Sequence, residues 1–377
     1  MPKQQSYRHH YIPQWYQKGF LLEGRTSFKI LDLYPQTFRN SKGAVVGKGR
    51  HILDKGPDAW FFERNLYTTR VLGEPNDDIE RLLFGTIDET GKEAIRALID
   101  SNWEKVHFTY TQVFEFLDAL RLRTPKGLRF LRSTLQTENQ QELMIAMQRM
   151  QRMRRMHCVM WMEGAIEIFE AGQSATKFIF SDHPVTFFNP HVFPKDRAIP
   201  EGLDVPQHWL GTQTLMPLDK ERLMVITHRE WGRKQGETRS RKPRTNARLF
   251  DNPLVTYDNI QRKRQLSESQ VREVNYIIKT RAERYIASCT VEDLFPERSL
   301  KTTLWSKLGK FLLPRSYATA LQSGFMTVKM QDGTYYFQDE FGRRPNSQSE
   351  LKQAKKNAVE MEAMLKRVLG NHFSDTD

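Results

Sequence analysis

The sequence predicts an α+β fold that is mainly helical, with a small antiparallel sheet and a C-terminal module made of a β-hairpin and a helix. Apolar residues recur at helical spacing through most of residues 77–171. Short β-prone runs between turn residues follow this helical region. Near the end of the chain, Asp332 and Gly333 separate two more β-prone runs, which is a strong signal for a hairpin.

The first half of the chain is expected to pass from strand to helix. Residues 28–34 alternate as a strand does, and residues 59–67 are too apolar for a free loop. Asp77 or Asp78 is a suitable N-cap for a helix that runs toward Ile87. Further helices are expected at residues 93–99, 111–122, 128–135 and, as the longest one, 138–171, either continuous or interrupted.

The second half combines strands with two more helices. Strands are expected at residues 177–180, 214–218 and 222–227, and a helix at residues 267–284 after a capping box formed by Ser267 and Gln270. The C-terminal hairpin (residues 325–337) is followed by an amphipathic helix at residues 349–369, with Gly370 as its stop. We therefore expect a main α+β domain over residues 1–290, a connecting segment over residues 291–324 and a C-terminal module over residues 325–377.

Composition places the chain among globular proteins. Of its 377 residues, 38% are hydrophobic, which is enough for a core and excludes a fully disordered chain. Neither a long apolar run nor an apolar stretch behind the N-terminus is present in the sequence, so we expect no membrane helix and no secretory signal. Because the chain contains only two cysteines, we expect a cytoplasmic location and no disulfide scaffold.

The charge balance points to a polyanionic partner. A net charge of +13 favours nucleic acid, although a basic surface that serves only solubility is the alternative. Two clusters carry the surplus. In the first, methionines recur every three residues from Met147 to Met156, which predicts a core-facing row, and a parallel row of arginines either tracks phosphates or faces solvent. The arginines of this row are Arg149, Arg152 and Arg155.

The second basic cluster spans residues 229–244 and is interrupted by glycine, serine and proline. These residues predict a mobile loop rather than a helix or strand. It either binds phosphates or is solvated. Its candidate nucleic-acid contacts are Arg239, Arg241, Lys242 and Arg244.

The motifs of P-loop, Rossmann and structural zinc proteins are absent from the sequence. Cys158 is adjacent to His157, but neighbouring residues on a helix point in different directions, so we interpret Cys158 as a buried residue.

Three polar clusters remain. The first contains His10 and Gln14, which suit a proton carrier and the group that orients it; the alternative is a buried N-terminal anchor.

The second cluster, Ser181 to Pro184, follows an apolar strand. Its Asp182 suits a base, a metal ligand or a group that orients a histidine. A turn capped by its side chain is the alternative. The third is Glu63, a carboxylate in an apolar setting that we expect to be ion-paired or to have a raised pKa. Arg123, before Thr124 and Pro125, is a cation that could hold either a phosphate or a carboxylate.

These motifs, in their order along the chain, resemble those of the bacterial domain-of-unknown-function 4238 family. The resemblance rests on the His-Tyr-Ile-Pro-Gln run from His10 to Gln14 and covers roughly residues 7–290. Further matching elements are Phe62-Glu63 to Tyr67, Arg123 to Pro125, Ser181 to Pro184 and Asn275 to Tyr285. The usual Asn after the Asp is His183 here, which weakens any role that needs an amide. The resemblance implies a fold, a candidate site and a cytoplasmic protein of the kind found among bacterial mobile and defence genes, but no activity.

The first functional hypothesis is a nuclease that acts on RNA or single-stranded nucleic acid, with His10, Gln14, Glu63, Arg123 and Asp182 in one pocket. His10 would transfer protons, Arg123 would stabilise the phosphate, and Glu63 with Asp182 would hold either a histidine or a divalent ion, Mg²⁺ or Mn²⁺. The second hypothesis is a nucleic-acid-binding or partner-binding module without activity. The third is an enzyme acting on a nucleotide or another phosphorylated small molecule. The C-terminal helix is the expected surface for a protein partner or self-association.

Overall fold

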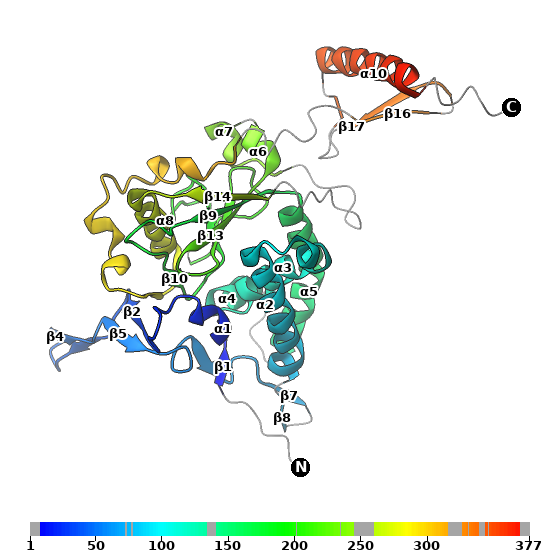
Figure 1. Ribbon diagram of the computed structural model, residues 1–377. Helices are drawn as coiled ribbons and strands as arrows, with labels where there is room; N and C mark the ends of the chain where they lie inside the picture. Colours follow the sequence, from blue (N-terminus) through cyan, green and yellow to red (C-terminus); the bar gives the residue numbers. More distant parts are fainter. Residues whose placement is uncertain are drawn as a thin grey trace.

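The computed structural model, drawn in Figure 1, describes residues 8–71, 74–76, 78–133, 141–200, 202–233, 235–244, 260–315, 326–330, 332–338, 344–345 and 347–369. Over these ranges the chain forms a mixed α+β fold with a five-stranded sheet, a four-stranded sheet and several two-stranded pairs. The prediction of a mainly helical fold with one small sheet is therefore wrong. The prediction failed because many strands of the two larger sheets are buried, and buried strands lack a clear sequence pattern.

The five-stranded sheet is buried on both faces along four of its strands. Its strands, in spatial order, are β11 (Thr186–Phe188), β12 (Gln213–Pro217), β13 (Arg222–Thr227), β9 (Ala165–Glu170) and β14 (Gln261–Gln265). Only β14 pairs in parallel. Along β13, Leu223 and Val225 belong to one apolar core, and Met224 and Ile226 belong to the other. A strand with two buried faces lacks the polar alternation that marks a half-exposed strand, so the size of the sheet is hard to read from sequence.

The long helix expected over residues 138–171 is two elements. Helix α5 covers Gln141–Met162, and Ala165–Glu170 is strand β9; residues 134–140 lie outside the described ranges. Gly164 allows the chain to turn between them, since a Cβ at this position would lie 2.5 Å from Cγ2 of Ile226. The strand is as apolar as the helix before it, so hydrophobicity alone does not reveal the change.

The four-stranded sheet is antiparallel throughout. Its order is β10 (Phe180–Ser181), β15 (Tyr285–Ser288), β2 (Phe28–Asp32) and β5 (Ile52–Lys55). The predicted strand at residues 28–34 is confirmed as β2. Helix α8 (Glu268–Arg281) leads into β15, and its predicted capping box is confirmed by the reciprocal hydrogen bonds of Ser267 and Gln270.

Most of the remaining helices form one layer. The layer contains α2 (Gly85–Asp100), which follows the π-helix η1 (Ile79–Phe84), then α3 (Trp103–Leu122), α4 (Pro125–Ser133) and α5. Figure 1 shows this layer on one side of the five-stranded sheet and α8 on the other. The larger core lies between the layer and the sheets and contains Phe114 of α3, Met150 of α5 and Ile226 of β13. This packing brings the ends of α3 and α5 close to the sheet, where the site lies.

Short elements complete the main body. Two-stranded pairs are β1 (Arg8–His10) with β6 (Phe62–Arg64), β3 (Thr37–Arg39) with β4 (Val45–Lys48), and β7 (Thr69–Val71) with β8 (Glu74–Asn76), and a short helix α1 covers Gln14–Lys18. Four 3-10 turns, η3 (Glu292–Leu294), η4 (Pro296–Arg298), η5 (Trp305–Lys307) and η6 (Lys310–Leu312), follow β15. They bury Trp305, Leu308 and Leu312 in the second core, which also contains the Leu223 face of β13.

The glycines and the proline of residues 229–244 predict a mobile loop, but part of this basic stretch is helical. It contains α6 (Arg229–Arg233) and α7 (Glu237–Ser240); Lys234 lies outside the described ranges. An ion pair joins the two helices, with Nη2 of Arg239 2.8 Å from Oε1 of Glu230. This pair holds the two short helices against each other.

The predicted C-terminal hairpin and helix are confirmed. Strand β16 (Met326–Lys329) pairs with β17 (Tyr335–Gln338), and Gly333 in the turn has a φ of 80°. Helix α10 (Gln348–Leu369) packs Ala354 and Ala358 against Phe337. Phe325, Gln331 and Gly370, together with the side chains of Met361, Leu365 and Val368, lie outside what the structure describes.

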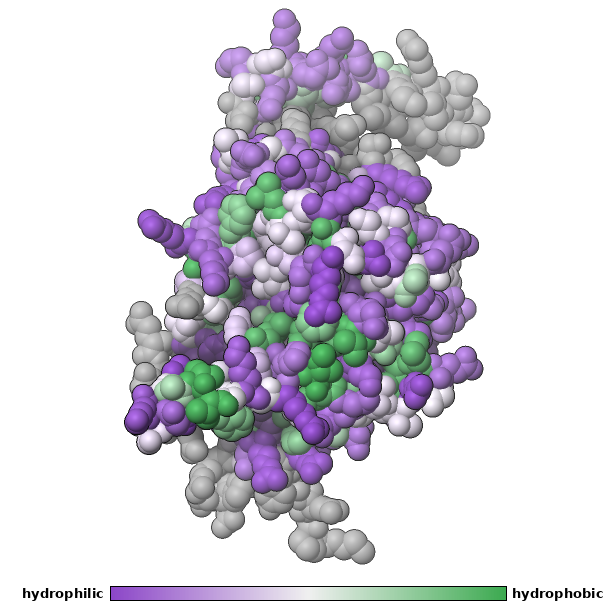
Figure 2. Space-filling model, turned by 90° about the vertical axis from the view of Figure 1, so that its left-hand side faces the viewer, coloured by the Kyte–Doolittle hydropathy of each residue, from purple (hydrophilic) through white to green (hydrophobic). Residues whose placement is uncertain are grey.

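The surface is largely hydrophilic. Figure 2 shows one face of the molecule, on which apolar residues gather in a few separate patches among polar ones. Exposed apolar side chains include Phe38, Val45 and Val46 of the β3–β4 hairpin. Within the described ranges, no helix combines the length and the apolar character that crossing a membrane requires.

Candidate functional site: a cavity between the helical layer and the five-stranded sheet

The first predicted pair, His10 and Gln14, comes together at the N-terminal end. Nε2 of His10 lies 3.5 Å from Nε2 of Gln14, and the imidazole packs against Phe62 at a ring distance of 5.4 Å. Burial is the main cause that lowers the pKa of His10. The two side chains are partly buried and in contact, and their role in proton transfer stays a prediction.

Glu63 and Arg123 are in opposite environments. Glu63 is exposed on β6, so the expectation of a carboxylate enclosed by apolar residues is wrong; its neighbour Phe61 is buried in the core, whereas Phe62 is only partly buried. Arg123 is fully buried and forms a bidentate ion pair with Asp88 of α2, with distances of 2.8 and 3.0 Å. Its guanidinium group also lies over the ring of Phe84. Arg123 therefore joins α2 to the end of α3.

Asp182 holds a turn of the neighbouring chain. Its carboxylate accepts backbone N–H bonds from Glu283, Arg284 and Tyr285 at 2.7–2.9 Å, where α8 passes into β15. Burial raises the pKa of Asp182 to about 6, even though these three bonds favour the charged form. The carboxylate caps a backbone turn, although of a more distant segment than the sequence suggested.

The basic residues differ widely in exposure. Arg149, Arg152 and Arg155 are exposed along α5, and Lys242 is exposed as well. Arg241 pairs with Asp196 at 2.6 Å, and Arg239 pairs with Glu230. Arg244 is buried, pairs with Glu163 and donates to the carbonyl oxygen of Met160. Three of these four residues, Arg239, Arg241 and Arg244, are thus engaged in ion pairs, and of the four only Arg244 is buried, whereas the α5 row is presented on the surface.

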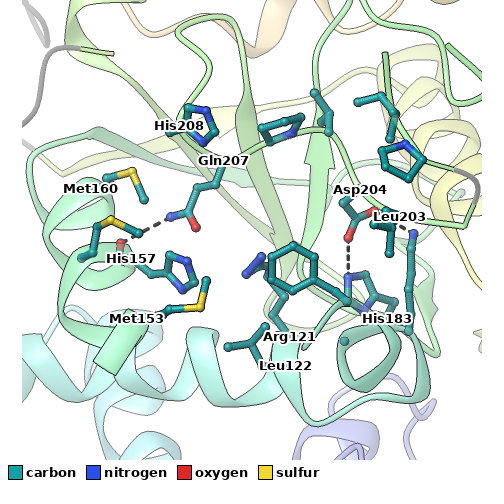
Figure 3. A pocket seen from close by; sticks show the side chains of 18 of the residues that line it. Arg121, Leu122, Met153, His157, Met160, His183, Leu203, Asp204, Gln207 and His208 are labelled. Carbon is teal, nitrogen blue, oxygen red and sulfur yellow. Dashed lines mark hydrogen bonds and ion pairs between the residues drawn. The ribbon is translucent and has the colours of Figure 1, made fainter. Parts of the chain in front are cut away.

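A cavity of about 370 Å³ opens between the end of α3, the start of α4, the second half of α5 and the segment before β12 (Figure 3). None of the five predicted catalytic residues lines it. Its polar and charged lining consists of Arg121, Lys126, His157, His183, Asp204, Gln207 and His208. The apolar lining includes Met153, Met156 and Met160 of α5, Phe130 of α4 and Ile199 and Leu203 of the opposite segment. A mostly apolar cavity with a few polar groups is typical of a small-molecule site.

His157 is oriented by a buried carboxylate. Its Nδ1 lies 2.6 Å from Oδ1 of Asp118, and Arg154 lies near the other oxygen at 3.7 Å. A carboxylate accepts hydrogen bonds, so Nδ1 carries the proton and the lone pair of the neutral ring is on Nε2. No described residue bonds Nε2, and the ring forms part of the cavity wall (Figure 3). The arrangement is that of a histidine prepared to accept a proton from a ligand or a water molecule.

Arg121 is a buried cation that has no hydrogen-bond acceptor among the residues that the structure describes. Its side chain is 6% exposed and lies between the rings of Phe130 and Phe187, at 5.2 and 4.7 Å from their centroids. Nη1 is buried, and no described residue accepts a bond from the guanidinium group. Burial lowers the pKa of Arg121, while Asp118 and Asp204 favour its charged form from a distance. In Figure 3 the side chain reaches toward the middle of the cavity, so an anionic ligand would supply the missing acceptor.

A charged network closes the opposite end. Asp204 lies 2.7 Å from each of three groups, Nζ of Lys126, Nη2 of Arg281 and Nε2 of His183. Nδ1 of His183 lies 2.8 Å from Oγ1 of Thr124. Burial opposes ionisation of Asp204, but the surrounding cations keep its pKa well below the usual value. The network fastens the segment that carries Asp204 to α4 and α8, and so fixes one wall of the cavity.

Two predicted motifs lie next to this cavity, although their candidate residues do not line it. Lys126 follows the Arg123–Pro125 turn, and His183 follows Asp182. His183 occupies the position at which the family resemblance expects Asn, and here its ring contacts Asp204. Asp118 and Arg121 were not among the residues predicted from the sequence. The available signal was two charged residues on a helix whose neighbours Phe114, Leu117 and Leu122 are apolar.

His157 was noted in the sequence only as the neighbour of Cys158. The thiol is buried, which raises the pKa of Cys158 above its usual value and keeps the group protonated. The interpretation of Cys158 as a buried residue agrees with its position. Among the residues that the structure describes, no group of three or more His, Cys, Asp and Glu side chains is arranged to hold a metal ion.

The comparisons with known proteins agree with the resemblance seen in the motifs. Residues 8–292 match a family described as a protein of unknown function (DUF4238), and the chain belongs to that family. Neither the curated proteins nor the solved structures contain a match to the chain. The function must therefore be argued from the cavity itself.

Proposed function

We propose that the protein is a hydrolase that acts on a nucleotide or another small phosphate ester bound in the cavity. The observation that carries the proposal is the shared placement of two groups. His157, held by Asp118, presents an acceptor nitrogen to the same cavity in which the buried guanidinium of Arg121 lacks an anion. A proton acceptor and a fixed cation are what phosphate ester hydrolysis needs.

The proposed reaction assigns one role to each group. Arg121 binds the phosphate oxygens and stabilises the charge that develops on them in the transition state. Nε2 of His157 takes a proton from water, and the water oxygen forms a bond to phosphorus as the bond from phosphorus to the ester oxygen breaks. The protonated imidazole then returns its proton to the leaving oxygen. Asp118 stabilises the charged ring between these two steps.

The test is hydrolysis of small phosphate esters by the full chain. The substrates are para-nitrophenyl phosphate, bis(para-nitrophenyl) phosphate, AMP and 2′,3′-cyclic AMP. We expect at least one to be hydrolysed, and His157→Gln to lower kcat by roughly 10²- to 10⁴-fold. His107→Gln is the matched control, because His107 is an exposed histidine on α3. Equal rates for wild type and His157→Gln, or no hydrolysis of any of these esters, would refute the proposal.

A nuclease remains the second candidate because of one specific observation. Helix α5 carries the cavity-lining His157 together with the exposed row Arg149, Arg152 and Arg155. A cationic row beside a cavity for one nucleotide suits a single strand whose backbone follows the helix. In this case labelled RNA or single-stranded DNA should be cleaved by wild type and not by His157→Gln.

A further inference from the structure

The cavity contains a second buried polar atom that has no partner within the described part of the chain. Gln207 is 6% exposed, and its Nε2 donates to the carbonyl oxygen of His157 at 3.3 Å. A carbonyl oxygen only accepts hydrogen bonds, so the amide nitrogen must face it. Oε1 is then directed away from the carbonyl oxygen of His157 into the cavity, as Figure 3 shows, and it is buried, with no described residue donating a hydrogen bond to it.

Arg121 and Gln207 make opposite demands on a ligand. The guanidinium of Arg121 needs an anion, and Oε1 of Gln207 needs an N–H or O–H group. A buried polar atom without a partner carries a desolvation penalty that a matching ligand group removes. A fully deprotonated phosphate satisfies only the first demand, because its oxygens accept hydrogen bonds and do not donate them to an amide oxygen.

The apolar wall beside these two atoms defines the rest of the ligand. Met153, Met156 and Met160 line it from α5. Thioether side chains are flexible and polarisable, and they make favourable contacts with aromatic rings. The methionine row that the sequence assigned to the core therefore serves two purposes, since Met147 and Met150 are buried in the core and the later members face the cavity.

We infer that the occupant is a nucleotide, with its phosphate on Arg121, an N–H group of its base on Oε1 of Gln207 and the face of the base on the methionines. Every nucleobase in a nucleotide that carries an amino or imino group presents such a donor on its edge. This inference rests on the proposed function, because it deepens the identity of the substrate at the same site. Gln207 becomes the residue that distinguishes a nucleotide from other phosphate esters.

The test is calorimetric titration of the full chain with AMP, GMP, CMP and UMP, and with ribose 5-phosphate and adenosine as the two halves of a nucleotide. We expect at least one monophosphate to bind about tenfold more tightly than ribose 5-phosphate, the contribution of one buried hydrogen bond and the base contacts. Gln207→Met should remove this preference, whereas Gln112→Met, a half-buried glutamine on α3 that does not line the cavity, should retain it. Arg121→Met should weaken the monophosphate and ribose 5-phosphate alike, by about 30-fold or more.

The outcome separates the inference from the proposed function. Monophosphates that bind no more tightly than ribose 5-phosphate, or a preference that survives Gln207→Met, would overturn the inference while His157-dependent hydrolysis of para-nitrophenyl phosphate could stand. Conversely, binding that depends on Arg121 and Gln207 in a protein that hydrolyses none of the esters would support the inference and refute the hydrolase. Asp118→Asn provides the bridge between the two readouts, because it should lose hydrolysis and keep binding. Thermal unfolding of each variant shows that it is folded.

Discussion

Asp118 on α3 and His157 on α5 lie 39 residues apart in sequence and 2.6 Å apart in space, between Oδ1 and Nδ1. Asp118 is fully buried, and His157 is 4% exposed. The carboxylate fixes both the tautomer and the direction of the ring, so Nε2 faces the cavity that also contains Arg121. This pair therefore provides the cavity with a group that can accept a proton.

Asp118→Asn tests the role of the pair without changing its size. An amide can present a donor to Nδ1, which favours the tautomer whose Nε2 carries the proton and cannot accept another. We expect kcat for a small phosphate ester to fall by about 10²-fold or more while KM changes little, because Asp118 does not line the cavity. A parallel rise in KM, or an unchanged kcat, would show that Asp118 serves only the packing of α3 on α5.

Arg121→Met tests whether the buried cation is maintained for a ligand. Methionine has a similar volume and needs no hydrogen bond, so it removes the cost of an unpartnered guanidinium. We expect the variant to be as stable as wild type or more stable, by up to about 4 kcal/mol in urea unfolding, while phosphate binding is lost. A clear loss of stability would instead assign Arg121 to the core.

Asp182→Asn tests the pH dependence of the turn between α8 and β15. Burial raises the pKa of Asp182 from 3.8 to about 6, so the folded protein binds this proton more tightly than the unfolded chain does. The stabilising contribution of the protonated group is full below about pH 4 and is lost as the pH rises through 6. The stability of wild type relative to Asp182→Asn should therefore fall by about 3 kcal/mol between pH 4 and pH 7. Urea unfolding at several pH values measures it; parallel curves would contradict the assignment.

The α5 row is tested by replacing Arg149, Arg152 and Arg155 with glutamine together. All three are exposed, so the free energy of unfolding should change little. If the protein is a nuclease, binding of single-stranded RNA should weaken and lose part of its salt dependence, while hydrolysis of para-nitrophenyl phosphate is retained. Unchanged RNA binding by the triple variant would show that the α5 row does not bind nucleic acid.

Local signals made part of the fold predictable. Strand β13 and the capping box at Ser267 follow from a few consecutive residues, and the same holds for the hairpin at Asp332 and Gly333. Strand β9 could not be read in this way, because both of its faces are buried and its apolar run continues that of α5. Its strand character depends on pairing with β13 and β14, which are distant in sequence.

The sequence indicated two of the segments that border the cavity, but not the side chains that line it. The turns at Arg123–Pro125 and Ser181–Pro184 both border the cavity, but Lys126 and His183 are the side chains that reach it. A motif marks a segment without showing which of its side chains points inward. The Asp118–His157 pair has no local signal at all, because it exists only once α3 and α5 pack together.

The most direct measurement of the central claim is an NMR titration of protein with ¹⁵N-labelled histidine, in which the ring signals of His157 are followed as AMP is added. His157→Gln assigns the signals, and exposed His107 serves as the internal reference. The account predicts that the Nε2 signal of His157 moves with AMP, that His107 does not, and that Arg121→Met abolishes the movement. AMP that binds or is hydrolysed while His157 stays unchanged would place the active site elsewhere.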